Sequence, residues 1–218
     1  GTEVRVEDMD KRIYNERAYK FKKHGFEHRD KKKILVIGTS FARDFTNIIV
    51  ENFDVHDIEL VYSDDLKECI VSAGNVHSKE YFSAADVIVF AGGGYSRNCL
   101  DEDLDYAKSY GKRIYYVGSK EFGYNLNWLI LKEPSGRANR YNMISPNLIL
   151  ADQIMKRDIP QGTYISLIGP LIVDGAIPIT DEKGNMLSTD RAHLTKYGAL
   201  YFGRKVVKHT KFAKEFDL

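Results

Sequence analysis

The chain has 218 residues, a net charge of +1, 43% hydrophobic residues and 29% charged residues. This length allows one domain with a proper core, and the balanced charge excludes a global basic field for binding nucleic acid. No apolar run approaches the ~20 residues that cross a bilayer. The first residues, GTEVRVEDMDKR, lack the apolar core of a signal peptide, so we expect the covered chain to be soluble.

The first thirty residues are dense in charge, but apolar side chains recur among them at roughly helical spacing. These side chains are Ile13, Tyr14, Ala18, Tyr19 and Phe21. The pattern predicts a peripheral helix. We therefore divide the chain into a helical, charged lead-in over 1–30 and a main domain over 31–218.

Five short apolar runs, rich in β-branched residues, follow the lead-in and alternate with helical stretches. The runs cover 34–38, 58–62, 86–94, 113–118 and 164–169. Continuous apolar strands separated by helices indicate a parallel sheet that is covered on both faces. We predict an α/β fold, a three-layer α/β/α sandwich with a mainly parallel five-stranded sheet. Ligands of such sheets bind at the carboxyl ends of the strands.

After the fifth run, the pattern changes to a hairpin around Lys183-Gly184-Asn185, and a last helix follows. Two other features concern bound groups. Gly92 to Gly94 lack the Lys-Ser/Thr of a phosphate loop, so we predict no cofactor. Cys69 and Cys99 have no zinc spacing, so we predict no metal; two buried thiols are favoured, and one disulfide remains open.

Ser40 stands at the junction between the first predicted strand and the helix after it, in the sequence Gly38-Thr39-Ser40. Two interpretations are open. The serine could be the N-cap of the helix. It could also be a nucleophile at the mouth of the sheet, where helix amides favour developing negative charge.

A serine nucleophile needs a base, because its hydroxyl is weak at neutral pH. Five of the six histidines lie in charged or polar connections, where we expect surface positions. His193 differs, because it directly precedes the last helix and Asp190 lies three residues earlier. The carboxylate could fix the imidazole tautomer and stabilise the imidazolium. Alternatively, Asp190 is a capping acid and His193 a residue of the first helical turn.

Two short blocks of the sequence carry a family resemblance. Gly38-Thr39-Ser40 resembles the Gly-Asp-Ser block of SGNH/GDSL hydrolases, and DRAHLT (190–195) resembles their C-terminal Asp-x-x-His block. More narrowly, residues 31–208 resemble the soluble SGNH-like domain at the C-terminus of type-three membrane acyltransferases. The resemblance implies a flavodoxin-like SGNH hydrolase fold. It also makes Ser40 the nucleophile, His193 the general base and Asp190 its orienting partner.

The sequence departs from this family at two places. Thr39 replaces the Asp of the first block, and Gly93-Gly94-Tyr95-Ser96 stands where the third block has Gly-x-Asn-Asp. The Asn that completes the family's oxyanion hole is therefore absent, and one lost donor costs about 100- to 1000-fold in turnover. The resemblance leaves as oxyanion-hole candidates Ser40, Gly74, Gly93, Gly94 and Asn98.

Aromatic and amide side chains follow the fourth predicted strand, in EFGYNLNW (121–128). Such side chains suit sugar binding, and they equally suit a packed loop. The candidate substrate-binding residues are Tyr95, Tyr124, Asn125 and Asn127. Arg43 and Asp44, one turn after Ser40, are expected to pair with each other, and residues 135–142 are expected to form an exposed polar loop.

The function that the resemblance implies is O-acyl transfer through an acyl-serine, with acetyl as the expected group. The acceptor would be a cell-surface polysaccharide or peptidoglycan outside the cytoplasm. A membrane acyltransferase domain would deliver the acyl donor, and no nucleic acid would take part. Two alternatives stay open: a free-standing carbohydrate O-acetyl esterase, and a glycan-binding SGNH-like module with weak or no catalysis.

Overall fold

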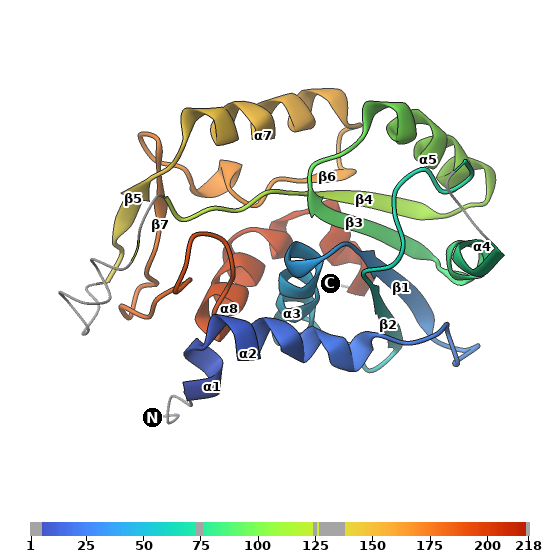
Figure 1. Ribbon diagram of the computed structural model, residues 1–218, viewed down its shortest axis with the longest axis horizontal. Coiled ribbons are helices and arrows are strands. Elements are labelled where there is room, and N and C mark those ends of the chain that lie inside the picture. Colours follow the sequence, from blue (N-terminus) through green and yellow to red (C-terminus); the bar gives the residue numbers. More distant parts are fainter. Residues whose placement is uncertain (1–5, 73–75, 124–125, 127–137, 217–218) are drawn as a thin grey trace.

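The computed structural model describes residues 6–72, 76–123, 126 and 138–216. Its main sheet has five strands, all parallel, in the order β2-β1-β3-β4-β6 (Figure 1). The strands are β1 (Lys32–Ile37), β2 (Ile58–Ser63), β3 (Val87–Gly93), β4 (Arg113–Gly118) and β6 (Tyr164–Ile165). They match the five predicted runs, and their order is that of a flavodoxin-like doubly wound sheet.

Helices cover both faces of this sheet, as the sequence predicts (Figure 1). One face is covered by α3 (Ser40–Asn52), α8 (Lys196–Lys205) and the 3-10 turns Val207–His209 and Lys211–Phe216. The other face is covered by α4 (Val76–Ala84), α5 (Arg97–Ser109) and α7 (Pro146–Asp158). Within β1, Ile34 and Val36 face the first group, whereas Leu35 and Ile37 face the second. This alternation follows from the two-residue period of a strand and confirms the three-layer fold.

The lead-in contains the predicted peripheral helix, which exposes Ile13 and Tyr19 but buries one side against α3. It forms α1 (Val6–Met9), α2 (Lys11–Glu16) and a 3-10 turn over Arg17–Phe21. Tyr14 and Ala18 are completely buried, and Asn47 of α3 donates a hydrogen bond to the Tyr14 carbonyl at 2.9 Å. The lead-in is therefore packed against the helix that begins at Ser40.

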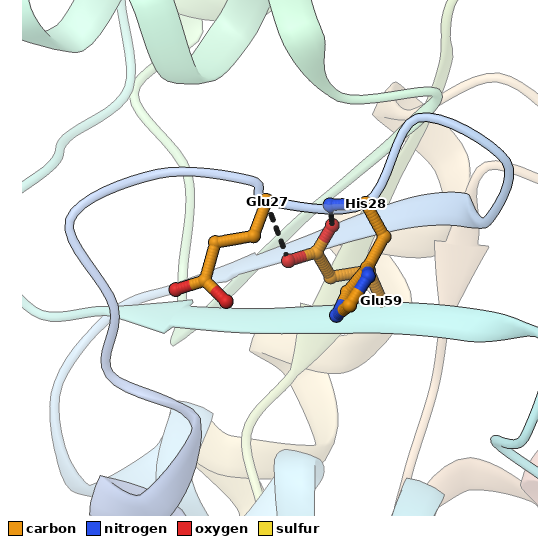
Figure 2. Close-up of side chains that lie close together, drawn as sticks. All are labelled: Glu27, His28 and Glu59. Atoms are coloured by element: carbon orange, nitrogen blue, oxygen red, sulfur yellow. Dashed lines mark hydrogen bonds between the residues drawn. The ribbon is translucent and has the colours of Figure 1, made fainter.

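A buried carboxylate fastens the connection between the lead-in and β1 to the sheet. Glu59 of β2 is 3% exposed, and its two oxygens accept the backbone amides of Glu27 and His28 at 2.8 Å each (Figure 2). Burial raises the pKa of Glu59, but these amides, together with the nearby charge of Lys23, hold the pKa below its usual value. Glu27, His28 and Glu59 are close enough to share a cation, yet the Glu59 oxygens already serve as the loop's anchor.

The last third of the chain contains a second, smaller sheet. β5 (Tyr141–Met143) pairs antiparallel with β7 (Ala176–Pro178). The prediction of a loop over 135–142 is therefore wrong for Tyr141 and Asn142, which form a strand, although Tyr141 is exposed as predicted. Residues 135–137 lie outside the described residues. The predicted hairpin is confirmed, because the Asp181 amide donates to the Asn185 carbonyl at 2.9 Å.

Cys69 and Cys99 form a disulfide, with Cα atoms 4.5 Å apart. The expectation of two buried thiols is therefore wrong. Asp103 lies on α5, as Cys99 does, and accepts the amides of Cys69 and Ile70 at 3.3 and 2.8 Å. These hydrogen bonds hold the segment of Cys69 next to Cys99. These contacts join segments 30 residues apart, so sequence spacing does not reveal them.

Reduction of the disulfide should lower the free energy of unfolding by about 2–4 kcal/mol, because a closed loop restricts the unfolded chain. Urea unfolding with and without dithiothreitol measures the effect. The double variant Cys69→Ser/Cys99→Ser is the matched control, and the reductant should leave its stability unchanged. Equal stability of the oxidised and reduced wild type would contradict the expectation.

Candidate functional site

Ser40 is the first residue of α3, directly after the carboxyl end of β1. Gly38 has a φ of +136°, and a Cβ there would lie 2.9 Å from the Ala91 carbonyl oxygen of β3. Only glycine fits this approach. Thr39, not Ser40, occupies the N-cap position, so the interpretation of Ser40 as the cap is wrong. Within the described part of the chain, Ser40 Oγ has no hydrogen-bond partner, which leaves it available for chemistry.

Asp190 and His193 form the predicted carboxylate–imidazole pair. Asp190 Oδ2 lies 2.8 Å from His193 Nδ1, and Oδ1 accepts the amides of Ala192 and His193 at 2.7 Å each. An ionised carboxylate only accepts hydrogen bonds, so Nδ1 carries a proton, and in the neutral imidazole Nε2 is then the acceptor. Thr195 is the N-cap of α8, and His193 therefore precedes the helix and is not part of its first turn.

The Asp190 carboxyl is held in its ionised form. Burial raises its pKa. The hydrogen bonds from the His193 ring and from the amides of Ala192 and His193 lower the pKa by more than burial raises it. The net result is a pKa well below the usual range of an aspartate. An ionised Asp190 can both orient the imidazole and stabilise a positive charge on it.

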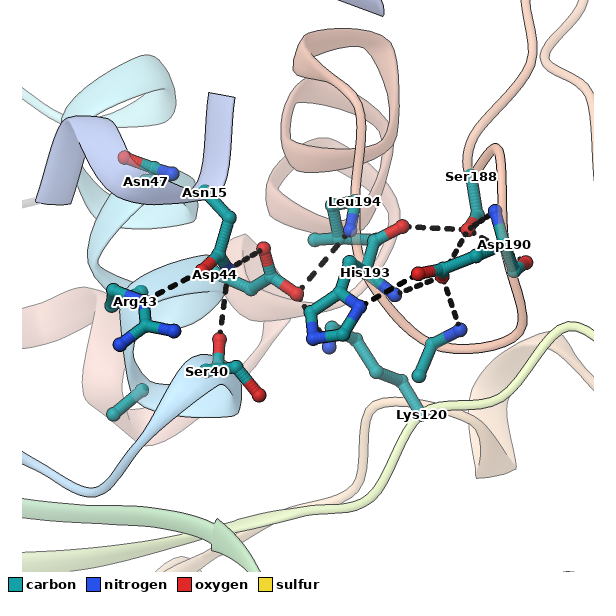
Figure 3. A network of polar contacts seen from close by, with 12 residues as sticks. Asn15, Ser40, Arg43, Asp44, Asn47, Lys120, Ser188, Asp190, His193 and Leu194 are labelled. Carbon is teal, nitrogen blue, oxygen red and sulfur yellow. Dashed lines mark hydrogen bonds and ion pairs between the residues drawn. The ribbon is translucent and has the colours of Figure 1, made fainter. Parts of the chain in front are cut away.

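The start of α3 and the segment around His193 belong to one polar network (Figure 3). Asn15 Nδ2 donates to the Ser40 carbonyl at 2.9 Å and to Asp44 Oδ1 at 2.7 Å. Asp44 Oδ2 in turn accepts the Leu194 amide at 3.3 Å. These contacts place the predicted nucleophile and base in the same region, although 150 residues separate Asp44 from Leu194.

No hydrogen bond joins Ser40 Oγ to the His193 ring in the described structure. The rings of Phe41 and His193 stack with centroids 6.5 Å apart, so the residue after Ser40 contacts the imidazole. Hydrogen bonds between a nucleophile and its base are often long in the unliganded protein and tighten when substrate binds. The arrangement is thus compatible with a Ser–His–Asp triad that is completed on binding.

Sequence analysis missed Lys120, which lies two residues beyond the end of β4. Its side chain is 1% exposed, and Nζ lies 2.6 Å from Asp44 Oδ2 and 4.0 Å from the centre of the Phe41 ring. Burial lowers the pKa of Lys120 below its usual value, and the charges of Asp44 and Asp190 oppose this effect only in part. The position of Lys120 just after a predicted strand could have marked it as a candidate site residue. A lysine at such a position is ordinarily exposed, however, so nothing in the sequence indicates its burial.

The expected pairing between Arg43 and Asp44 is also wrong. Asp44 is completely buried against Lys120. Arg43 points elsewhere: its Nε donates to Asn15 Oδ1 at 2.6 Å, and Nη1 donates to the Tyr19 hydroxyl at 2.9 Å. Tyr19 belongs to the lead-in, and so a contact outside the main domain decides where Arg43 points.

The candidate oxyanion-hole residues lie at several places. The Ser40 amide is in the first turn of α3, where helix amides lack intrahelical partners. Gly93 ends β3 in a left-handed conformation with a φ of +79°, at the same edge of the sheet. Gly94 and Asn98 are exposed, and Asn98 lies in the first turn of α5. Gly74 lies outside the described residues.

The candidate substrate-binding residues are only partly described. Tyr95 donates its hydroxyl to Asp158 Oδ2 of α7 at 2.9 Å, and its ring meets Tyr116 edge-on. Tyr95 thus packs the sheet against α7, and its predicted contact with substrate stays a prediction. Tyr124, Asn125 and Asn127 lie outside the residues that the structure describes.

Two cavities flank the start of α3. The first, of about 430 Å³, opens where the strand order reverses between β1 and β3, the usual ligand crevice of such sheets. Its lining includes Gly38, Thr39, Leu66, Phe90, Gly92 and Cys99. The second, of about 240 Å³, is lined by six polar residues, Arg12, Asn15, Glu16, Arg43, Asp190 and His193. The lead-in therefore supplies half of the wall beside the imidazole.

Comparisons with known proteins identify no family for this chain. No protein-family model matches the sequence, and no curated protein matches it. Among the described helices, none is both long and apolar enough to cross a membrane. Fold and site together define a class: an α/β protein with a strand-end serine beside an aspartate–histidine pair.

Replacement of Asp190 by Asn should lower the free energy of unfolding at neutral pH by about 2 kcal/mol, because charge-assisted hydrogen bonds are lost. The depressed pKa of Asp190 makes its contribution complete above the ordinary aspartate pKa, and the contribution is lost progressively as pH falls from there towards the lower pKa of the folded state. Asp190→Asn should therefore flatten the acid dependence of stability, measured by urea unfolding between about pH 2 and pH 7.

Asp57→Asn is the matched control, since Asp57 pairs with His56 at 3.1 Å but is 98% exposed. Exposed pairs contribute little, so this variant should unfold like the wild type. An unchanged acid dependence in Asp190→Asn would contradict the expected role of Asp190.

Proposed function

We propose that this protein catalyses serine-dependent O-acyl transfer, with acetyl as the expected group, to a cell-surface polysaccharide or peptidoglycan. The observation that carries the proposal is the network that places the Asp190–His193 pair against the helix beginning at Ser40. His193 Nε2 and the Ser40 hydroxyl, neither of which bonds to a described residue, would supply a base and a nucleophile.

The proposed reaction has two halves. Ser40 Oγ attacks the acyl carbonyl while His193 Nε2 takes the hydroxyl proton, and the imidazolium then protonates the departing group of the donor. In the second half, His193 deprotonates an acceptor hydroxyl, which attacks the acyl-serine; the bond from the acyl carbon to Ser40 Oγ breaks, and the imidazolium returns its proton to Ser40 Oγ. Amides at the start of α3 would stabilise the oxyanion in both halves. This chemistry needs no cofactor.

The proposed cellular setting follows from the family resemblance. The acyl donor would be delivered by a membrane acyltransferase domain, and the site would face the extracytoplasmic side of the membrane. The Cys69–Cys99 disulfide supports this setting, because structural disulfides persist in oxidising compartments.

Two alternative functions have some support. A free-standing carbohydrate O-acetyl esterase would use the same residues with water as the acceptor. A glycan-binding module with weak or no catalysis is favoured by the absence of a Ser40–His193 hydrogen bond in the described structure and by Tyr95 in place of the family's Asn.

Ser40→Ala should reduce hydrolysis of a chromogenic acetyl ester to the background rate, a loss of at least about 10⁴-fold if the triad operates fully. Initial rates with purified wild type and variant provide the measurement. Ser83→Ala is the control, because Ser83 is exposed on α4 and its hydroxyl bonds only the Glu80 carbonyl of the same helix. Equal rates for Ser40→Ala and wild type would refute the assigned nucleophile.

An oligosaccharide acceptor should accelerate release of the chromogenic group by the wild type, because transfer resolves the acyl-serine faster than water does. Mass spectrometry should then detect acylated oligosaccharide. Turnover that no acceptor accelerates would favour the esterase. Oligosaccharide binding without turnover in wild type would favour the glycan-binding module.

A further inference from the structure

A buried ion pair lies between the two halves of the candidate site. Lys120 and Asp44 are 1% and 0% exposed, and their charged atoms are 2.6 Å apart. Lys120 Nζ makes no well-aligned hydrogen bond to any described residue, so its attraction to the Asp44 carboxylate and the Phe41 ring is what holds it. A buried charge without such a partner is strongly unfavourable.

Asp44 uses both of its oxygens to connect other segments. Oδ1 accepts from Asn15 of α2, and Oδ2 accepts from the Leu194 amide as well as facing Lys120. Asp44 lies one helical turn after Ser40, and Leu194 directly follows His193. The carboxylate is therefore the direct link between the helix of the nucleophile and the backbone of the base (Figure 3).

Lys120 is also linked to the imidazole of His193 through the Phe41 ring. Its ammonium lies 4.0 Å from the centre of the Phe41 ring, and that ring stacks on His193. A cation over an aromatic face is attracted to it, more strongly when both are desolvated. Lys120 thereby holds the ring that packs against the base.

We propose that Lys120 is a positioning residue, whose ammonium compensates the buried Asp44 carboxylate so that Asp44 can hold the Leu194 amide and place His193 against the start of α3. Lys120 is 1% exposed and its ammonium faces Asp44 and the Phe41 ring, so it acts through these neighbours and not on substrate. Its effect on turnover rests on the proposed function, whereas its effect on Leu194 does not.

The test compares Lys120→Met with the double variant Lys120→Met/Asp44→Asn. Methionine keeps most of the side-chain volume without the charge, and asparagine removes the charge that would be left unpaired. Lys112→Met is the matched control: Lys112 directly precedes β4, and its Nζ bonds the Ser83 carbonyl in an exposed contact. The readouts are kcat and KM on an acetyl ester, and hydrogen exchange of the Leu194 amide by NMR.

Lys120→Met should lower kcat at least about tenfold with KM changed less than about threefold, because the base is displaced but no substrate contact is lost. Exchange of the Leu194 amide should accelerate at least about tenfold, because an uncompensated Asp44 no longer holds it. The double variant should recover part of both losses, and Lys112→Met should behave as wild type.

Several outcomes would overturn the proposal: wild-type kcat and wild-type Leu194 exchange in Lys120→Met, or a double variant no better than the single one. If Lys120→Met does not fold, a folded double variant supports compensation and an unfolded one refutes it. If the wild type itself shows no turnover, the proposed function fails, and Leu194 exchange still decides the role of Lys120.

Discussion

The candidate site depends on one buried carboxylate, Asp44. Its oxygens contact the side chain of Asn15, the ammonium of Lys120 and the amide of Leu194. A carboxylate removed from water must be compensated by hydrogen bonds and opposite charge. This requirement draws together four segments: the lead-in, the helix that begins at Ser40, the end of β4 and the segment before α8.

The parallel sheet explains why the segments around Asp44 come together at one edge of the sheet. All five strands end on the same side, so the segments after β1, β3 and β4 lie close together there. Gly38 permits β1 to approach β3 closely before the chain turns into α3. The Cys69–Cys99 disulfide closes part of the cavity beside this turn. The sheet thus sets the position of Ser40, and the polar network sets the position of His193 relative to it.

Features with local physical causes were predictable. Apolar, β-branched runs indicated all five strands of the main sheet, although the last one is shorter than its run. The hairpin at Lys183-Gly184-Asn185 follows from turn chemistry. The Asp190–His193 pair forms because three residues of backbone bring carboxylate and ring together. Each depends on neighbours within a few residues, which a single sequence displays.

Features with distant partners were not predictable. The Cys69–Cys99 bond, the pairing of β5 with β7 and the burial of Tyr14 and Ala18 all need contacts between segments far apart. The sequence by itself determined the strands, the serine at a strand end and the Asp190–His193 pair. Only the tertiary structure decided that Lys120 and Asp44 are buried together beside them, because burial depends on which surfaces the folded chain removes from water.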